Sequence, residues 1–407
     1  MAVLKFFAPR GFHARVSPAP FLTLAALSQA GASFVQQGIV VMGVFFASHY
    51  RLTLAQMGLV TTALSLGITS SMVVMGAASD RMGPRRLLFY GAIGMSGLSL
   101  ALLRQSRFGM LLLILFGLGV MLAIAAAAGT KAVFTAFRDR PRGTVMGIRQ
   151  TGVPLGALLA ASVLPRMASG SHGLQPTFWL FAIEVLLLGW AFSGVMQSGI
   201  EEAAIKRPRI NLSVVSQIWR PALVSTLMVS GQYLLLGFSL TDLHQTHGIS
   251  LVTGGLILAL AQLGGGAGRI LTGFVSDRLG GRRPPVIVGC AFIAALMALV
   301  VAAMPARVSI VWLALVWFFF GVGAVGWNAL TITWAGESVP SQHSGFAMSA
   351  VGTCAFLGSA IFPPLFGALV DATHQFNLGW ALLGIFLAAV GVMTWRFGRT
   401  AAKVSKA

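Results

Sequence analysis

The chain is a succession of apolar runs, each about as long as a bilayer is thick. A helix needs roughly 20 apolar residues to cross the hydrocarbon core. Twelve spans are predicted, near residues 21–47, 56–78, 86–104, 109–135, 145–165, 176–196, 221–240, 251–275, 286–304, 308–334, 345–369 and 377–396. Several connections between them are short enough that only helical hairpins fit. Because backbone in lipid must satisfy its own hydrogen bonds, we predict an all-α membrane protein.

The composition agrees with this class. Only 9% of the residues are charged and 57% are hydrophobic, whereas a soluble domain carries about 25% charged residues. The net charge of +19 could suit nucleic acid, but the cations form short clusters between apolar runs, without a basic stripe, so we expect no nucleic-acid partner. Cys290 and Cys354 lie inside apolar runs and indicate neither a disulfide framework nor a metal site.

The distribution of Lys and Arg predicts the orientation. If the N-terminus is cytoplasmic, 20 of the 28 cations fall on the inner side and 5 on the outer side, as the positive-inside rule requires. Both termini are therefore expected in the cytoplasm of a bacterial cell, with the spans in the inner membrane. The predicted parts are a tail at 1–20, a six-helix bundle at 21–196, a cytoplasmic linker at 197–220, a second six-helix bundle at 221–396 and a tail at 397–407.

One charged turn occurs twice, 197 residues apart. The first copy contains Gly76, Asp80, Arg81, Gly83, Arg85 and Arg86, and the second contains Gly273, Asp277, Arg278, Gly280, Arg282 and Arg283. Residues outside the turn repeat as well: Ser33 falls on Ser230, and Gly143 falls on Gly345 at an offset of 202. A duplication of six spans predicts two pseudo-symmetric halves with a cavity between them.

The doubled G-x-x-x-D-R-x-G-x-R-R turn, together with twelve spans and a central linker, resembles the major facilitator superfamily over about residues 20–397. The resemblance implies a secondary transporter whose two halves expose one site to each side of the membrane in turn. It also implies that Asp80 faces the start of helix 11 near Ser344, and that Asp277 faces the start of helix 5 near Arg142. A carboxylate is stabilised at a helix N-terminus by unpaired N–H groups and the helix dipole.

Four ionisable residues lie inside predicted spans: Arg149, Arg269, Glu184 and Lys131. Such residues are functional candidates because they are costly in a membrane. Arg149 falls opposite Val351 in the repeat and Arg269 falls opposite Met72, so neither arginine belongs to the duplicated scaffold. Glu184 is a candidate for ion coupling or a hydrogen-bonded peripheral acid, and Lys131 is a candidate for gating or for contact with the loop around Asp80.

The two arginines are expected at one depth, because each lies six residues inside its helix. In the resembled fold, helices 5 and 8 face each other, and the pairs Gly152/Gly156 and Gly264/Gly268 favour close approach. Two guanidiniums without an acid partner favour an anion between them. Some anion-carrying branches of the superfamily, such as nitrate and oxalate carriers, have an Arg eight residues before the motif Asp, as Arg269 is here. The nitrate carriers' matching Arg in helix 2 is replaced by Met72.

A second reading of both arginines stays open, in which they reach the inner surface or bond to helix-end carbonyls. Further polar candidates in the cavity helices are Gln36, Gln37, Gln150, Gln232, Tyr233, Trp327 and Asn328. Pro154, Pro363 and Pro364 are expected to interrupt helices 5 and 11. Asp242, His244 and His247 form a weak metal pattern in a predicted outer loop.

We therefore predict a monomeric carrier of a small organic anion, with or without a co-transported ion, working by alternating access. Efflux of drugs or other amphiphiles is the alternative, and a non-transporting sensor is a distant third. Helix 5 carries Gly152-Val-Pro154, partly like the antiporter signature, but the usual acid of proton-coupled exporters in helix 1 or 4 is absent. No nucleophile–base pair or nucleotide-binding sequence stands out, so neither an enzyme, nor a cofactor, nor a resident metal is expected.

Overall fold

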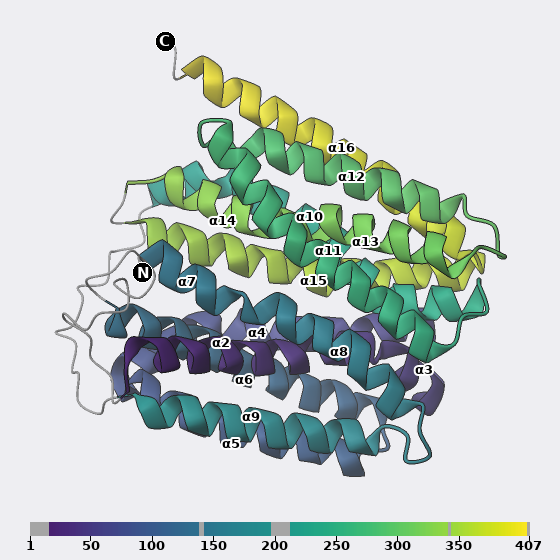
Figure 1. The fold of residues 1–407 in the computed structure, drawn as a ribbon, viewed down its shortest axis with the longest axis horizontal. Helices are drawn as coiled ribbons and strands as arrows, with labels where there is room; N and C mark the ends of the chain where they lie inside the picture. The colour runs from purple at the N-terminus through teal and green to yellow at the C-terminus, as the bar shows by residue number, and fades with distance from the viewer. Residues whose placement is uncertain (1–15, 138–141, 197–211, 341–342, 405–407) are drawn as a thin grey trace. The chain divides into compact units, whose positions relative to one another are not determined.

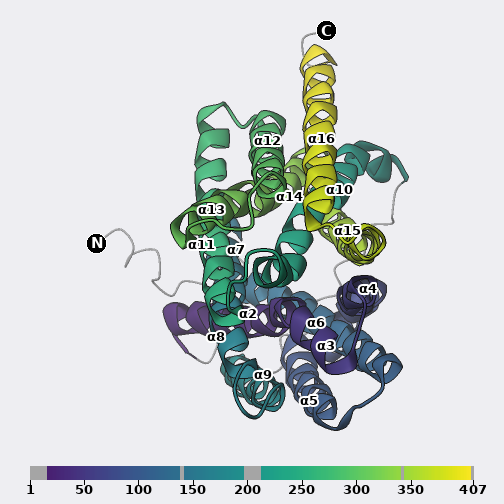
Figure 2. The ribbon, with the colours of Figure 1, turned by 90° about the vertical axis from the view of Figure 1, so that its right-hand side faces the viewer.

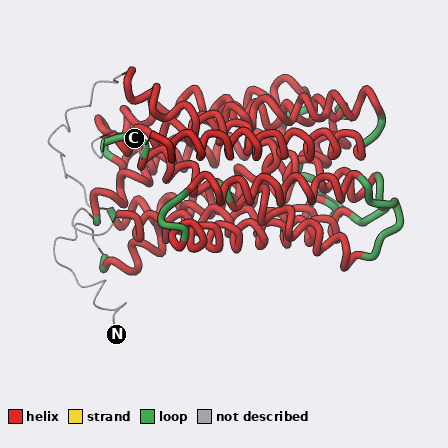
Figure 3. The backbone as a smooth tube through the Cα atoms, turned by 90° about the horizontal axis from the view of Figure 1, so that it is seen from above, coloured by secondary structure: helices red, strands yellow, loops and turns green. Residues whose placement is uncertain are grey.

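The computed structural model describes residues 16–137, 142–196, 212–340 and 343–404, and the elements in these ranges are helices joined by short loops (Figure 3). Their bounds are α2 Pro18–Val41, α3 Gly43–Tyr50, α4 Leu54–Met82, α5 Pro84–Ala101, η1 Leu102–Arg104, α6 Phe108–Ala136, α7 Arg142–Gln150, α8 Gly152–Ala168, α9 Gln175–Val195, α10 Leu212–Gln245, α11 Leu251–Arg278, α12 Arg283–Ala302, α13 Ile310–Gly326, α14 Asn328–Glu337, α15 Ser344–Thr373 and α16 Phe376–Val404.

Twelve helical segments of the described chain are long and apolar enough to cross a membrane, which confirms the predicted number of spans. Some of their starts carry local caps: the Ser250 side chain accepts from Thr253 N at α11, and the Ser309 side chain accepts from Trp312 N at α13. Such caps satisfy amides that lack a partner in the first helical turn. Helix α10 begins at Leu212, within the predicted linker 197–220, and residues 197–211 lie outside the described residues.

Three predicted spans are each divided into two helices, and only the interruption of the fifth span was expected from the sequence. The first breaks at Met42, the fifth at Thr151 and the tenth at Trp327. In the fifth span the cause is local, since Pro154 has no N–H for the Gln150 carbonyl and restricts the residue before it. The interruption therefore precedes Pro154 rather than falling on it.

The expected interruption at Pro363 and Pro364 is wrong. Helix α15 runs without a break from Ser344 to Thr373 and contains both prolines. Two carbonyls one turn earlier, those of Ser359 and Ala360, lose their amide donors. Helix α4 supplies one replacement, because Thr62 Oγ1 donates to the Ala360 carbonyl at 2.6 Å.

The chain forms two compact units. The first comprises residues 1–39, 63–160 and 167–206, and the second comprises residues 40–62, 161–166 and 207–407. Within the first unit α5 runs beside α9 (Figure 1), and within the second α11, α12 and α13 lie together (Figure 2). This division follows compactness rather than chain order, so the bundle boundaries at 21–196 and 221–396 stay a prediction.

Glycines allow close helix contacts, but not between the partners that the sequence suggested. Gly264 and Gly268 of α11 lie against α13, at Phe318 and Val322. Gly152 and Gly156 of α8 lie against α2, in the turns around Ala30. Helices α8 and α11 do meet within the second unit, at Gly255, which lies against the Ala161 carbonyl and Pro165. The glycine pairs thus build each unit internally.

The tight α11–α13 contact yields a stability prediction. Gly321 of α13 lies against the Ala261 backbone, so Gly321→Val should destabilise the protein by about 1–3 kcal/mol through overpacking. Gly289→Val in α12 is the matched control, because nothing lies within 4 Å of a Cβ there. Thermal unfolding in detergent measures both variants, and equal shifts would contradict the packing argument.

Candidate substrate site and gate loops

Arg149 is a buried cation with unused donor capacity. It lies in the last turn of α7 and is 3% exposed. Its Nη1 donates to Thr130 Oγ1 at 3.3 Å and its Nη2 to the Ala125 carbonyl at 3.2 Å, both on α6. Gly129 makes room for the guanidinium, since a Cβ there would collide with Nη2. Nε is buried without a partner among the described residues, which include no carboxylate paired with this arginine. A buried, unneutralised guanidinium is unfavourable, so this site is chemically suited to an anion.

Arg269 caps a helix end. The last carbonyls of a helix have no amide in the next turn to accept from, and α13 ends at Gly326 inside a predicted span. Side chains replace the missing donors: the carbonyl of Ala324 accepts from Trp327 Nε1 (2.7 Å), that of Val325 from Arg269 Nε (3.5 Å) and that of Gly326 from Thr272 Oγ1 (2.9 Å). The geometry of Arg269 thus matches the reading in which the arginine bonds to helix-end carbonyls.

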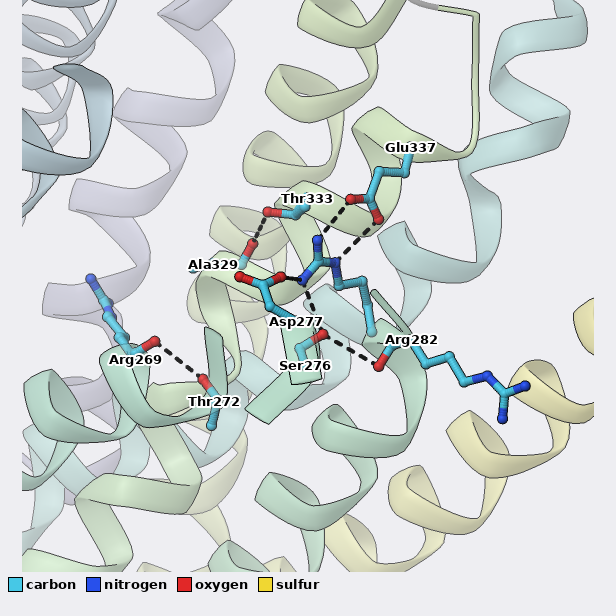
Figure 4. A network of polar contacts seen from close by, with 9 residues as sticks. Arg269, Thr272, Ser276, Asp277, Arg282, Ala329, Thr333 and Glu337 are labelled. Atoms are coloured by element: carbon cyan, nitrogen blue, oxygen red, sulfur yellow. Dashed lines mark hydrogen bonds and ion pairs between the residues drawn. The ribbon is translucent and has the colours of Figure 1, made fainter. Parts of the chain in front are cut away.

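The terminal nitrogens of Arg269 remain available. They form no hydrogen bond or ion pair within the described part of the chain. Figure 4 shows the side chain extending away from Asp277 and its neighbours. Arg269 can therefore cap α13 through Nε and still present two nitrogens to an anion.

Two amide side chains also contain a buried polar atom that has no hydrogen-bond partner among the described residues. Gln37 on α2 is 4% exposed and Gln232 on α10 is 7% exposed, and the Oε1 atom of each is buried without a partner among the described residues. Such orphaned oxygens call for a donor from water or a ligand. Both glutamines thus remain candidates for contact with hydroxyl groups.

The other polar candidates differ in their surroundings. Trp327 is fully buried and its indole N–H is taken by Ala324, so it serves the helix break rather than an open site. Gln150 is exposed at the end of α7. Gln36 and Asn328 are half-buried, and Tyr233 is buried.

The candidates divide between the two units. Gln36, Gln37, Arg149 and Gln150 belong to the first unit, whereas Gln232, Tyr233, Arg269, Trp327 and Asn328 belong to the second. Within the second unit the structure brings Arg269 next to the turn before Trp327. The shared site for Arg149 and Arg269 stays a prediction.

The second copy of the repeated turn, residues 273–283, is called the second gate loop after its expected role, and it holds a charge network. Helix α11 ends at Arg278, and Gly280 and Gly281 adopt φ values of 70° and 77°, which glycine tolerates best. Arg283, at the start of α12, then joins several acceptors: Asp277 Oδ1 at 2.7 Å, Glu337 Oε1 and Oε2 at 2.9 and 3.2 Å, and Ser276 Oγ at 3.0 Å. Figure 4 shows Asp277 and Glu337 converging on this point. The network ties the ends of α11 and α14 to the start of α12.

The first gate loop, which is the first copy of the repeated turn at residues 76–86, is described only in part. Gly83 adopts φ 79° between α4 and α5, as the repeated turn requires. The side chain of Asp80, like that of Arg142, lies outside the described residues, so the expected contacts of Asp80 and Asp277 with helices 11 and 5 stay predictions. Lys131 Nζ donates to the Ser79 carbonyl at 3.3 Å, which places it beside this loop.

Glu184 lies on α9 inside the first unit. Its Oε1 is buried without a partner among the described residues. Its other oxygen lies against Gly31 of α2, where a Cβ would collide with it. Small residues of α2, α5, α6 and α9 line a cavity next to this contact, including Gly31, Ala92, Ala125 and Gly189.

The contacts of Asp242, His244 and His247 do not support the weak metal pattern. Asp242 lies within α10 rather than in a loop, and its carboxylate accepts from Trp380 Nε1 at 2.9 Å and Thr246 Oγ1 at 2.6 Å. His244 and His247 each contact a backbone carbonyl. Across the described residues, no group of three metal-ligating side chains was found.

The family model for the Major Facilitator Superfamily matches residues 24–363. The chain belongs to this superfamily. It is thus a multi-pass membrane protein and a secondary transporter, not an enzyme, as the sequence predicted.

Three named relatives are similar to this transporter over most of its length. An uncharacterized MFS-type transporter of Mycobacterium tuberculosis is 30% identical over 353 residues, which cover 84% of this chain and 77% of the relative. A hexuronate transporter of Bacillus subtilis is 28% identical, covering 87% of this chain and 88% of the relative. A probable L-galactonate transporter of Escherichia coli is 23% identical, covering 85% and 81%.

The fold is that of solved superfamily members. A crystal structure of a mutant nucleoside transporter, NupG, matches with a TM-score of 0.76 at 12% identity, covering 94% of this chain and 99% of that one. At this identity the match concerns the fold alone, and it confirms the predicted all-α architecture.

Two residues of the transporter escaped the sequence reasoning. Glu337 completes the second gate loop, and Thr272 caps the α13 break. Glu337 could have been found, because it is one of only nine acids set against 28 cations and stands at the end of an apolar run. Thr272 carried no signal, since its role depends on which helix lies beside α11.

The α13 cap can be tested with an isosteric change. Thr272→Val removes the hydroxyl that donates to Gly326 and should destabilise the transporter by about 1 kcal/mol. Thr333→Val is the control, because that hydroxyl donates only to Ala329 of its own helix (Figure 4). Thermal unfolding in detergent compares them, and a loss no larger for Thr272→Val would contradict the capping role.

Proposed function

We propose that this transporter carries a small organic anion of the sugar-acid class, with Arg149 and Arg269 binding the carboxylate. The observation that carries the proposal is Arg149: a buried guanidinium with an unpaired Nε and no carboxylate partner among the described residues. Arginine presents a planar fork of donors that fits a carboxylate. An anionic cargo would supply both the missing acceptor and the missing charge.

The relatives support this class of cargo. The Bacillus subtilis relative is named for hexuronate and the Escherichia coli relative for L-galactonate. Both compounds combine one carboxylate with several hydroxyl groups. The orphaned Oε1 atoms of Gln37 and Gln232 can accept from hydroxyl groups of this kind.

The proposal also covers the orientation of the carrier in the membrane, its oligomeric state and its coupled ion. The Lys and Arg distribution supports cytoplasmic termini, so the gate loops around Asp80 and Asp277 would lie on the cytoplasmic side of the inner membrane. The carrier would act as a monomer. Glu184 would bind the co-transported proton, because it is an acid inside a span with an unpaired oxygen.

The cargo class is tested by counterflow in proteoliposomes loaded with hexuronate or galactonate. Arg149→Gln and Arg269→Gln should each reduce exchange of the acid, roughly 10- to 100-fold, since each removes a charge-assisted hydrogen bond of about 1.5–3 kcal/mol. Arg149→Lys keeps the charge but not the fork and should lie in between.

Arg166→Gln is the matched control, because that arginine is exposed at the end of α8. It should exchange at the parent rate, and size-exclusion chromatography verifies that every variant is folded. Parental exchange by both folded arginine variants, or exchange of amphiphilic cations in place of the acids, would overturn the proposal and favour the efflux alternative.

Proton coupling is tested separately on Glu184→Gln. The amide cannot release a proton, so uptake driven by a pH gradient should fall at least roughly tenfold. Counterflow at equal pH should stay near the parent rate, because exchange needs no net proton movement. Undiminished gradient-driven uptake would remove Glu184 from the coupling mechanism.

A further inference from the structure

The side chain of Arg220 is held against two aromatic rings near the start of α10. Its guanidinium carbon lies 5.5 Å from the ring centroid of Trp219 and 5.5 Å from that of Phe397 on α16. The two rings also contact each other edge to face, with their centroids 5.1 Å apart. A guanidinium is attracted to the negative face of an aromatic ring. The aromatic pair therefore positions this cation without accepting a hydrogen bond from it.

The donors of Arg220 have no acceptor in the part of the chain that the structure describes. Its Nε is buried without a partner, and the side chain forms no hydrogen bond or ion pair there. A guanidinium carries five N–H donors and keeps its charge in proteins. By contrast, Arg283 of the same unit is paired with Asp277 and Glu337. Among these residues Arg220 thus lacks both an acceptor and a counter-charge.

The surface around Arg220 is apolar and exposed. On α10 the exposed residues Val215, Trp219 and Leu223 follow one another at intervals of four, so they lie on one face of the helix. Val392 and Trp395 are exposed on α16, the helix that contacts α10. Both helices are long and apolar enough to span a membrane, and tryptophan is enriched where a span meets the lipid headgroups. The two exposed tryptophans therefore indicate that this surface lies at the headgroup level.

The end of α16 adds positive charge to this surface. The guanidinium carbon of Arg399 lies 4.5 Å from the ring centroid of Trp395, and the side chain forms no hydrogen bond or ion pair within the described part of the chain. Arg396 is exposed one turn before the end of this pair. Because Phe397 contacts Arg220, the end of α16 lies beside the start of α10. Two arginines that are stacked on exposed tryptophans are thus brought to one corner of the second unit.

We propose that this corner, formed by the start of α10 and the end of α16, binds the headgroup of an anionic phospholipid. The phosphodiester accepts hydrogen bonds from the forked guanidinium of Arg220, whose planar geometry matches two phosphate oxygens. Arg399 adds attraction for the net negative charge, as basic residues at a membrane surface do for anionic lipids. Trp219 and Trp395 pack against the glycerol and the upper acyl chains.

The apolar surroundings favour a lipid over a soluble anion. Free phosphate would meet the same donors, but it would leave the exposed faces of α10 and α16 uncovered, whereas the acyl chains of a lipid cover them. The site is separate from the one proposed for the cargo. None of its residues is a proposed cargo ligand, and all of them belong to the second unit.

The site is tested by lipid binding to the purified full-length transporter. Phosphatidylglycerol and phosphatidylcholine, which share the phosphodiester but differ in net charge, are titrated into the detergent solution, and native mass spectrometry measures the affinity for the first bound lipid. Arg220→Gln should weaken binding of phosphatidylglycerol at least roughly tenfold, since it removes charge-assisted hydrogen bonds. It should affect phosphatidylcholine much less. Arg220→Lys keeps the charge but not the fork and should lie in between, and Arg399→Gln should weaken binding by a smaller factor.

Arg307→Gln is the matched control, because it removes an exposed arginine of the same unit from the loop between α12 and α13. It should bind phosphatidylglycerol like the parent. Parental binding by folded Arg220→Gln would refute the lipid site, and if that variant does not fold, parental binding by Arg399→Gln would refute it. Inorganic phosphate that raises the thermal unfolding midpoint of the parent as strongly as phosphatidylglycerol does would contradict the lipid assignment and indicate a soluble anion. The measurement uses no cargo, so its outcome is independent of the proposed sugar acid.

Discussion

Every backbone group that loses its helical partner inside the apolar part of this protein must find another one. Water is not available there, and an unpaired carbonyl or amide is costly. The structure meets this requirement with side chains from neighbouring helices. Arg269 and Thr272 cap the carbonyls at the end of α13, Thr62 caps the carbonyl that Pro364 abandons, and Asp371 caps the start of α4. The same bonds that permit breaks and prolines also decide which helices stay together.

The charged side chains, like the backbone groups, depend on a small number of partners. With nine acids and 28 cations in the chain, carboxylate partners for the cations are scarce. Glu337 and Asp277 share Arg283 at the second gate loop, and Asp242 lies buried with Trp380. Arg149 has no such partner among the described residues, and its unpaired Nε is the basis for an anionic cargo. The interaction that the family resemblance led us to expect at Asp80, a carboxylate on a helix N-terminus of another span, is seen at Asp371.

The sequence predicted much of the fold but little of its detail. The number of spans, the duplication and the superfamily followed from apolar runs and one repeated turn, because both are local patterns. The breaks at Met42 and Trp327 and the unbroken course of α15 did not follow. Proline and glycine show where a helix is weak, but whether it breaks there depends on its surroundings, and at the end of α13 another helix supplies donors. For the candidate site, the sequence singled out Arg149 and Arg269 by their absence from the repeat, whereas their bonding partners on α6 and α13 could not be inferred.

The sequence by itself determined that this chain crosses a membrane twelve times, since the free energy of placing a segment in lipid depends on that segment's own composition. It also contains the charged turn twice. Only the tertiary structure decided that Arg269 caps a helix, that Gly264 packs against α13, and that Asp371 holds α4. The physical reason is that a hydrogen bond requires two groups within about 3 Å, and residues 317 positions apart reach that distance only through the fold.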